Sequence, residues 1–245
     1  MLELRSFTRS LERSRRALNR TDRPATFALA GREWDLLGGV FSPADSATTR
    51  VAAEVLGLAG GTQPDFWRQG SFLEIGCGTG VIAVSAALAG CPRVVATDVN
   101  PAAVRNAEAN VARHGVADRV RVVHSDLFAA LDPAERFDTV YWHSNFVLAP
   151  DDYPYATDHE RAYVDPGYRA HRRYLTGAPE LLTEGGSALL QFSDRGDLAL
   201  LHDIAAECGR ELRVFDRREF LEGGERIAHL LLGITAAGRP GAAAG

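Results

Sequence analysis

The residues with the clearest chemical potential lie in a glycine-rich turn that a carboxylate precedes. The segment from Glu74 to Gly80 reads Glu-Ile-Gly-Cys-Gly-Thr-Gly. Glycines at Gly76, Gly78 and Gly80 let the backbone approach a ligand closely, because no Cβ atom stands in the way. A dinucleotide fingerprint would place its third glycine where the chain has Val81. The negative charge of Glu74 also suits a ligand with positive charge better than a pyrophosphate.

A second carboxylate falls at the end of the next expected strand, which covers residues 93–97. Asp98 can there accept hydrogen bonds from both hydroxyl groups of a ribose. Val99 beside it offers an apolar face for an adenine ring. The pair predicts a nucleoside site next to the glycine turn.

A third carboxylate follows the strand expected over residues 119–124. Asp126 can accept a hydrogen bond from the exocyclic amine of adenine, and Leu127 can pack on the ring. S-adenosylmethionine contains an adenosine and carries both a sulfonium and an ammonium group, so it satisfies Asp98, Asp126 and Glu74 together. The three carboxylates therefore favour S-adenosylmethionine as the cofactor.

Residues 71–145 resemble the class I S-adenosylmethionine-dependent methyltransferases. The resemblance implies that the methionine end of the cofactor lies on Glu74, Gly76, Cys77 and Gly78, the ribose on Asp98 and the base on Asp126. The complete set of expected cofactor-binding residues is Glu74, Gly76, Cys77, Gly78, Gly80, Asp98, Val99, Asp126 and Leu127.

The segment after the fourth expected strand carries candidates for the methyl-acceptor site. Residues 143–146 read His-Ser-Asn-Phe. They align with the N-P-P-Y motif of the subgroup that holds the release-factor glutamine methyltransferases and the adenine amino-methyltransferases, and the wider similarity covers residues 26–235. In that subgroup the asparagine and a proline carbonyl hold a planar amide or amino nitrogen. His143 stands at the asparagine position and cannot copy the paired donor and acceptor of an amide.

His143 is the candidate catalytic residue. A histidine with the ordinary pKa near 6.5 can serve as a general base at neutral pH. The alternative is a structural histidine that makes one hydrogen bond. Phe146 can stack on a substrate or belong to ordinary packing.

A long connection over residues 148–163 is a candidate lid over the substrate. Its tyrosines and acidic residues suit a cationic or aromatic substrate. The alternative is a mobile surface loop without contact to substrate. We expect the substrate to contact His143, Phe146, Tyr153, Tyr155 and Phe41. The acidic residues and His159 match no metal-binding motif, so no metal is expected.

Strands and helices alternate from residue 71 onward, which predicts an α/β fold: a Rossmann-like, doubly wound sheet, mostly parallel, with a C-terminal antiparallel strand. The expected strands cover residues 71–75, 93–97, 119–124, 137–142, 187–192, 213–219 and 226–234. The expected helices cover residues 80–88, 101–114, 166–182 and 197–208. Ligands of such sheets bind beyond the carboxyl ends of the strands, where all the candidates above fall.

The chain divides into three expected parts. Residues 1–60 form an N-terminal cap with an arginine-rich helix over 2–20, a hairpin over 26–42 and a helix that Asp45 or Ser46 caps. Residues 61–235 form the methyltransferase domain, and residues 236–245 a disordered tail. The arginine-rich helix either covers the main domain or is an arm for an anionic partner.

Composition limits the partners and the compartment. The net charge of −5 argues against a dedicated nucleic-acid binder, and all 27 basic residues are arginine. No apolar run reaches the length that crosses a bilayer, so no membrane is expected. The charged N-terminus does not fit a signal peptide, which favours the cytoplasm.

These features predict an enzyme that transfers a methyl group from S-adenosylmethionine to oxygen or nitrogen of a small molecule, with a role in biosynthesis. The alternatives are N-methylation of a protein side chain, methylation of RNA, and a non-catalytic cofactor-binding module. The oligomeric state stays open.

Overall fold

A single large sheet organises the chain, and the computed structural model describes residues 6–59, 70–222 and 224–237. Its strands are β3 (Ser71–Ile75), β4 (Arg93–Asp98), β5 (Val120–His124), β6 (Phe137–His143), β9 (Leu182–Ser193), β10 (Arg210–Glu222) and β11 (Glu225–Ala236). They lie in the order β10-β11-β9-β6-β3-β4-β5. β11 runs antiparallel to both of its neighbours, whereas β9, β6, β3, β4 and β5 are mutually parallel. The predicted fold class, with one antiparallel C-terminal strand, is confirmed.

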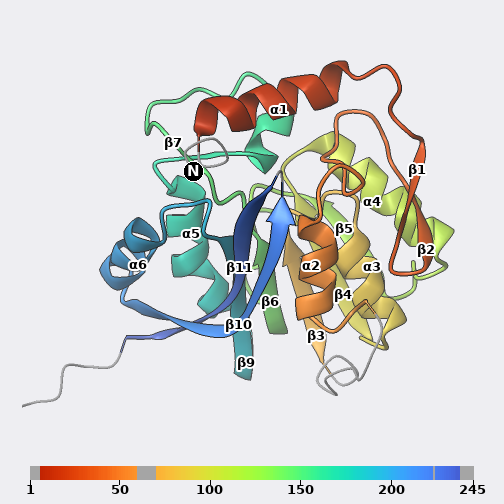
Figure 1. The fold of residues 1–245 in the computed structure, drawn as a ribbon. Helices are drawn as coiled ribbons and strands as arrows, with labels where there is room; N and C mark the ends of the chain where they lie inside the picture. The colour runs from red at the N-terminus through yellow and green to blue at the C-terminus, as the bar shows by residue number, and fades with distance from the viewer. Residues whose placement is uncertain (1–5, 60–69, 223, 238–245) are drawn as a thin grey trace, which may run out of the picture.

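Helices cover both faces of this sheet (Figure 1). One face packs against α2 (Thr48–Val55), α3 (Val81–Leu88) and α4 (Pro101–Arg113), and the other against α5 (Arg169–Gly177) and α6 (Leu198–Glu207). Alternate residues of each strand serve the two faces. On β3, Phe72 belongs to the core under α3, and Leu73 belongs to the core under α5. The continuous apolar strands of the sequence follow from burial on both faces.

The helix expected over residues 166–182 is shorter than predicted. Gly167 and Tyr168 have φ angles of 56° and 51°, which no α-helix accommodates. The carboxylate of Asp165 instead accepts hydrogen bonds from the amides of Ala170 and His171, at 3.2 and 3.1 Å, and so starts α5. Pro179 lies in a 3-10 turn after α5, and the chain from Leu182 onward already belongs to β9. The prediction missed the left-handed residues that delay the start of the helix.

The expected caps of α2 are also wrong, because the helix begins at Thr48 and Ala47 precedes it. Asp45 forms an ion pair with Arg20 at 2.8 Å and is therefore used elsewhere. None of the helices in the described ranges is both long and apolar enough to span a membrane. The predicted boundary between positions 60 and 61, and residues 238–245 of the predicted tail, lie outside the described residues.

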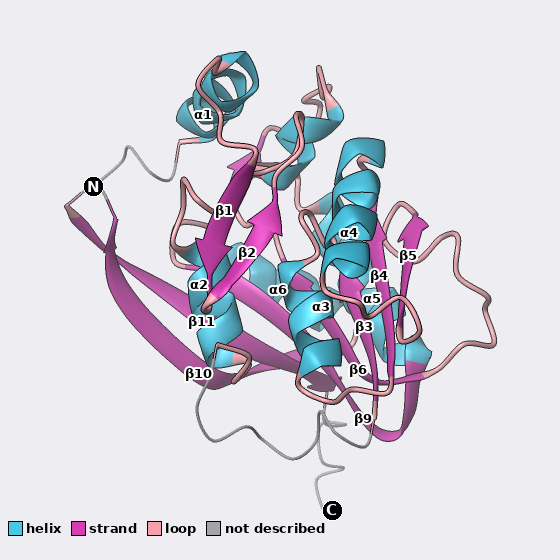
Figure 2. Ribbon diagram, turned by 90° about the vertical axis from the view of Figure 1, so that its right-hand side faces the viewer, coloured by secondary structure: helices cyan, strands magenta, loops and turns pink. Residues whose placement is uncertain are grey.

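The N-terminal residues form a helix and a separate hairpin. Helix α1 (Phe7–Asn19) lies across the top of the molecule in Figure 1, on the side where β6 ends. The hairpin of β1 (Thr26–Leu29) and β2 (Arg32–Asp35) stands beside α4 (Figure 2). Its two-residue turn, Ala30 and Gly31, has positive φ angles at both positions, as the twist of a tight hairpin requires. The expected helix and hairpin are both present, but the hairpin ends at Asp35 and not at residue 42, and the helix ends at Asn19.

Two buried asparagines of α4 attach the hairpin to the main domain. Asn110 Oδ1 accepts a hydrogen bond from the Asp35 amide at 2.7 Å, and its Nδ2 donates to the Thr79 carbonyl at 2.8 Å. One turn earlier, Asn106 Oδ1 accepts from the Leu37 amide at 2.8 Å. Among the described residues no third strand pairs with β2, and the two asparagine side chains bind the backbone of Asp35 and Leu37 instead. Hydrogen bonds from buried side chains, as well as apolar contacts, therefore attach the hairpin to the main domain.

Asn110→Ala should lower the free energy of unfolding by about 2–4 kcal/mol, because it removes hydrogen bonds from the amide and carbonyl of Asp35 and from the buried carbonyl of Thr79. Urea denaturation measures the change. Glu108→Ala, on the exposed face of the same helix, is the control and should change stability by less than about 0.5 kcal/mol. Equal stabilities of the two variants would show that the asparagine contacts do not hold the cap.

Candidate active site

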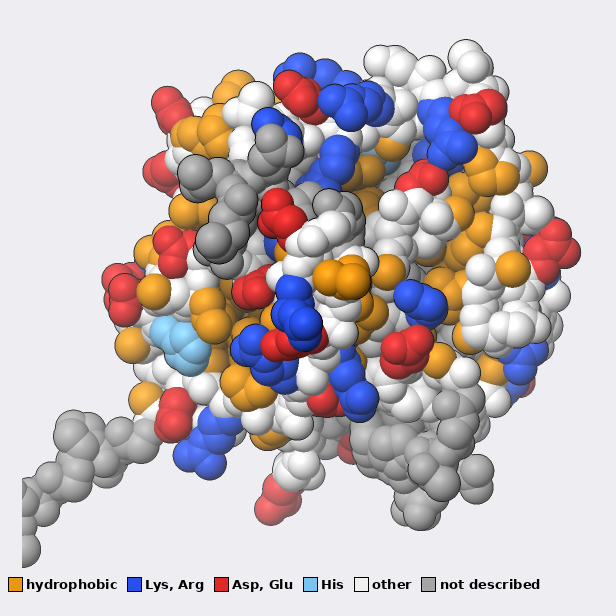
Figure 3. All heavy atoms as spheres, viewed as in Figure 1, with side chains coloured by type: hydrophobic (Ala, Val, Ile, Leu, Met, Phe, Trp, Pro, Cys, Tyr) orange, Lys and Arg blue, Asp and Glu red, His pale blue; other side chains and the backbone are white. Residues whose placement is uncertain are grey.

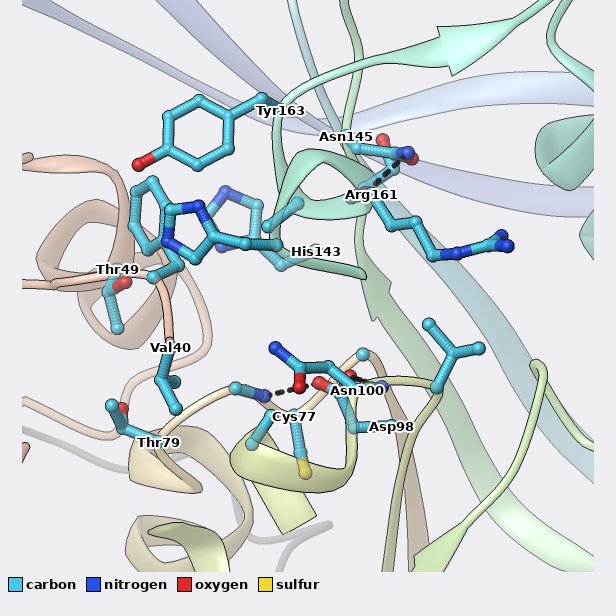
Figure 4. A pocket seen from close by; sticks show the side chains of 18 of the residues that line it. Val40, Thr49, Cys77, Thr79, Asp98, Asn100, His143, Asn145, Arg161 and Tyr163 are labelled. Carbon is cyan, nitrogen blue, oxygen red and sulfur yellow. Dashed lines mark hydrogen bonds between the residues drawn. The ribbon is translucent and has the colours of Figure 1, made fainter. Parts of the chain in front are cut away.

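One pocket of about 470 Å³ lies at the carboxyl ends of the parallel strands, under α1. Among the described residues that line it are most of the predicted site residues: Phe41, Glu74, Gly76, Cys77, Gly78, Asp98, Val99, Asp126, Leu127, His143, Phe146 and Tyr155. Gly80 and Tyr153 are not among the lining residues. Figure 4 shows two groups of side chains on opposite sides of the cavity, one around Asp98 and one around His143. We call these sides the donor half and the acceptor half.

The glycine turn forms the floor of the donor half. Gly76 and Gly78 have φ angles of 64° and 54°, a region that favours glycine. A Cβ atom on Gly76 would lie 3.2 Å from Nε1 of Trp142, so a larger residue there would crowd that side chain. Gly80 serves packing instead, because a Cβ atom there would lie 3.0 Å from Ala107, and the glycine allows α3 to approach α4. Burial raises the pKa of the Cys77 thiol, which therefore stays neutral.

Glu74 is buried beneath this turn. Its Oε2 accepts a hydrogen bond from the Ala83 amide, in the first turn of α3, at 2.8 Å. Burial raises the pKa of the carboxyl group well above its usual range, the Ala83 hydrogen bond opposes the shift, and Asp98 adds to it. A cation placed in the donor half would favour the charged form of both carboxylates. The electrostatics of this half thus suit a positively charged ligand.

Asp98 is held rigidly at the end of β4. Its Oδ2 accepts a hydrogen bond from the Gly78 amide at 2.8 Å, and its Oδ1 accepts one from the Asn100 amide at 2.9 Å. Burial raises the pKa of Asp98, and the two amides oppose the shift. Asn100, which the sequence analysis missed, caps α4 and donates from Nδ2 to the Gly39 carbonyl at 2.8 Å. Its position directly before Pro101, the first residue of α4, was the signal.

Asp126 lies nearer the surface than expected for a residue that binds the adenine amine. It forms an ion pair with Arg173 of α5 at 2.8 Å, in which both side chains are about half exposed. Leu127 next to it is buried and has a φ angle of 56°. Leu127 therefore offers a fixed apolar surface, whereas Asp126 would have to share its carboxylate with Arg173.

His143 ends β6 on the acceptor half. Burial lowers the pKa of its imidazole to about 4. His229, on β11, lies behind it with the ring centroids 6.0 Å apart. The expectation of a base with an ordinary pKa is therefore wrong: the ring is neutral at pH 7, with one nitrogen that donates and one that accepts a hydrogen bond.

The two residues after His143 hold the backbone of the site. Ser144 Oγ donates to the Gln191 carbonyl at 2.9 Å, which ties the end of β6 to β9. Asn145 Nδ2 donates to the carbonyls of Arg161 and Val164, at 2.8 and 2.7 Å (Figure 4). Because the amide hydrogens of Asn145 are used in this way, its role is to position the segment above the pocket.

Phe146 lines the pocket and also packs in the core. Its ring contacts Phe192 and His229, with centroids at 6.2 and 5.4 Å, and the guanidinium of Arg195 lies 5.4 Å from the ring centroid. Packing therefore explains much of its position. Arg195 lines the same pocket and was missed by the sequence analysis. It follows the end of β9, a parallel strand that reaches the same edge as β6.

The connection after β6 is ordered by its own hydrogen bonds. Strand β7 (Leu148–Ala149) pairs with β8 (Asp165–Pro166), and the 3-10 helix η2 (Asp158–Ala162) lies between them. Tyr153 Oη donates to Glu160 Oε2 at 3.0 Å, and Tyr155 Oη donates to the Val164 carbonyl at 3.1 Å. Tyr153 packs against Phe7 of α1, outside the pocket, while Tyr163 packs edge-on to Phe41 and lines the cavity.

Helix α1 forms the roof. Ser14 Oγ and His159 Nδ1 are hydrogen-bonded at 2.7 Å, which fastens α1 to η2. Arg13, Arg16 and Arg20 line the pocket beneath. Leu18 of this helix is exposed. In the ranges 6–59, 70–222 and 224–237, no three His, Cys, Asp or Glu side chains gather in a way that could hold a metal ion.

The chain is similar to known proteins over most of its length. Residues 72–167 match the methyltransferase domain family. The release factor glutamine methyltransferase of Bordetella pertussis is 31% identical over 219 residues, which cover 84% of this chain and 76% of that protein. The ribosomal protein L11 methyltransferase of Pelotomaculum thermopropionicum is 44% identical over 63 residues, 26% of this chain and 20% of that protein.

A solved structure shares the fold. The 16S rRNA N2 G1207 methyltransferase of T. thermophilus, in complex with AdoMet and guanosine, superposes with a TM-score of 0.50 at 19% identity, over 89% of this chain and 50% of that one. The expected small-molecule partner is corrected by the curated relatives, because the two described above are named for protein substrates, a release factor and a ribosomal protein.

The pKa of about 4 predicts that the His143 ring does not take up a proton between about pH 8 and pH 5.5. Heteronuclear NMR of the ring carbons measures this, and His143→Gln assigns the signal by its loss. Since the pKa of the folded state lies below that of an unfolded histidine, His143 contributes stability above about pH 6.5 that is lost as the pH falls toward 4. A midpoint near pH 6.5 for this ring would contradict its burial.

Proposed function

Because the chain belongs to the class I S-adenosylmethionine-dependent methyltransferases, near the release factor glutamine methyltransferases, we propose that it methylates a side-chain nitrogen of a protein, of the glutamine amide type. The similarity to the Bordetella pertussis enzyme carries this proposal. An alignment that covers 84% of the chain necessarily spans both halves of the pocket, so it includes the acceptor wall as well as the cofactor turn.

The donor half fits S-adenosylmethionine, which supplies an electrophilic methyl group on its sulfonium. We propose that the two fixed oxygens of Asp98 accept hydrogen bonds from the ribose hydroxyls. The open surface of Gly76 and the buried carboxylate of Glu74 would face the charged methionine end. Val99 and Leu127 would flank the adenine, and Asp126 would accept from its amine in competition with Arg173.

The acceptor half suits a planar amide. A neutral His143 can accept a hydrogen bond from an amide N–H at neutral pH, and this orients the nitrogen toward the donor half. As the C–N bond forms and the C–S bond breaks, the nitrogen becomes strongly acidic. A ring of low basicity then suffices to take the released proton and pass it to water. His143 would act mainly by position, which is why its lowered pKa is compatible with the reaction.

The cap would complete the enclosure. We propose that residues 6–59, the described part of the expected cap, act with η2 as the wall that shields the transfer from water. The hydrogen bond between Ser14 and His159, together with the contact of Phe41 with Tyr163, supports this role.

Methyl transfer to protein is tested with tritiated S-adenosylmethionine and a panel of a release factor, ribosomal protein L11 and 16S ribosomal RNA. Label in a protein, located on a side-chain nitrogen by mass spectrometry, is the expected result. Label in the RNA alone would overturn the proposal. A protein labelled on oxygen would contradict the nitrogen assignment.

Asp98→Asn should weaken the binding of S-adenosylmethionine at least about tenfold, because it replaces a charged acceptor of two ribose hydrogen bonds by an amide. Isothermal titration calorimetry measures the affinity. Asp118→Asn removes an exposed carboxylate far along the chain from the turn and is the matched control, with an expected change of less than twofold. Unchanged affinity in Asp98→Asn would remove Asp98 from the cofactor site.

His143→Ala should lower kcat about 100-fold and leave the affinity for S-adenosylmethionine within about twofold of the wild type. His143→Asn restores an acceptor and should recover part of the loss. Turnover with the labelled protein substrate, together with calorimetry of the cofactor, separates the two effects. If His143→Ala turned over like the wild type, the ring would have no part in the transfer.

A further inference from the structure

The charge of the chain is unevenly distributed along the sequence. The first 23 positions hold seven arginines and three acidic residues, whereas the other 222 positions hold 20 arginines and 29 acidic residues. The N-terminal segment is therefore basic, and the rest of the chain, which we call the acidic body, has a net negative charge. Most of that segment is α1, the helix that roofs the pocket.

The arginines of α1, together with Arg20 directly after its last residue, include a set that lies on one side of the helix. Arg9, Arg13, Arg16 and Arg20 follow each other at spacings of four, three and four positions. At 3.6 residues per turn these spacings keep the side chains within a sector of about 60°. The buried side chains of α1 are Ser10, Leu11 and Ser14, and they form a different face. We call the four residues the arginine stripe.

The arginine stripe runs along the opening of the pocket. Arg13, Arg16 and Arg20 are lining residues of the cavity, and Arg9 continues the row away from it. Arg9, Arg16 and Arg20 are exposed to solvent. Figure 3 shows basic side chains gathered over the α1 end of the molecule, above a hollow. A group bound in the acceptor half would thus have a row of positive charges beside it.

The ion pairs of Arg16 and Arg20 compete only weakly with a ligand for these two arginines. Arg16 Nη2 lies 3.5 Å from Glu12 Oε2, and both side chains are largely exposed. Arg20 pairs with Asp22 and Asp45 at 2.7 and 2.8 Å, also near the surface. Exposed pairs of this kind contribute little free energy, so a ligand with several carboxylates can exchange with them.

We propose that the arginine stripe docks an acidic segment of the protein substrate, next to the residue that enters the acceptor half. This inference rests on the proposed function. The stripe covers about 16 Å along the helix, which matches about five residues of extended chain. Glutamate or aspartate at several of those positions would face the guanidinium groups and fix the register of the methylated residue.

Two observations favour an acidic peptide segment over a nucleic acid. A long polyanion would continue onto a body in which acidic residues outnumber basic ones, and this body would repel it. The described part of α1 also offers no exposed aromatic ring for base stacking, because Phe7 packs edge-on against Tyr153 at 6.2 Å. A short anionic segment would contact the arginine stripe without reaching the acidic body of the protein.

The test measures fluorescence anisotropy of three labelled probes at low salt. They are a short peptide with one glutamine beside a run of glutamates, the same peptide with lysines in their place, and single-stranded RNA of equal length. Arg9→Gln combined with Arg16→Gln should weaken the binding of the glutamate peptide about fivefold. Arg15→Gln removes one positive charge from the same helix outside the stripe; it is the positional control and should change the binding less than twofold.

Equal weakening by the control, or none by the double variant, would overturn the proposal. Tighter binding of the RNA than of the glutamate peptide, lost in the double variant, would overturn it in favour of a phosphate-binding surface. The proposed function can fail separately. If the glutamate peptide needs the stripe but no protein accepts a methyl group, only the function is wrong; if a methylated protein shows the same KM with the double variant, only the stripe is wrong.

Discussion

The buried carboxylate of Asp98 is the interaction on which the rest of the site depends. It accepts hydrogen bonds from the amides of Gly78 and Asn100, and its own carbonyl accepts one from the Ser125 amide at 2.9 Å. Through Asn100 the same junction reaches the Gly39 carbonyl of the cap. Asp98 and Asn100, through side chain and backbone together, thus join the turn after β3, the end of β4, the residue after β5 and the N-terminal segment. A buried carboxylate with these partners costs desolvation energy, which a ligand with hydroxyl donors and positive charge would offset.

The acceptor half differs from the donor half in the charge of its buried groups. Its polar groups are neutral: burial keeps His143 uncharged, Ser144 binds the β9 backbone, and Asn145 binds the backbone above the pocket. Charged side chains also line the pocket: the arginines of the stripe lie at the opening, Arg161 lies beside Asn145, and Arg195 lies beside Phe146. A neutral amide is compatible with such an interior, and an anionic flank is compatible with such an opening. The amide and the acidic segment of the proposed substrate would therefore occupy neighbouring parts of one surface.

Much of the pocket could be predicted because the carboxyl ends of parallel strands meet at one edge. Alternation of apolar strands and helices indicated the sheet, and the residues at or just after the ends of β3, β4, β5 and β6 supply about half of the lining. Local conformation was harder: the positive φ angles of Gly167 and Tyr168 shorten a helix whose apolar pattern looks continuous. The lowered pKa of His143 arises from burial next to β11, which is 86 positions away at His229, and no local pattern reports it. Positions 153 and 155 are both tyrosine, but Tyr153 packs against Phe7 of α1 and Tyr155 lines the pocket. This difference arises from tertiary packing.

A crystal structure with S-adenosylhomocysteine, the product of the cofactor, tests most directly whether one pocket has a donor half at Asp98 and an acceptor half at His143. We expect both ribose hydroxyls within hydrogen-bonding distance of the Asp98 carboxylate, and the sulfur facing His143 across the cavity. A product bound with its ribose away from Asp98, or with its sulfur turned from His143, would contradict this division of the pocket.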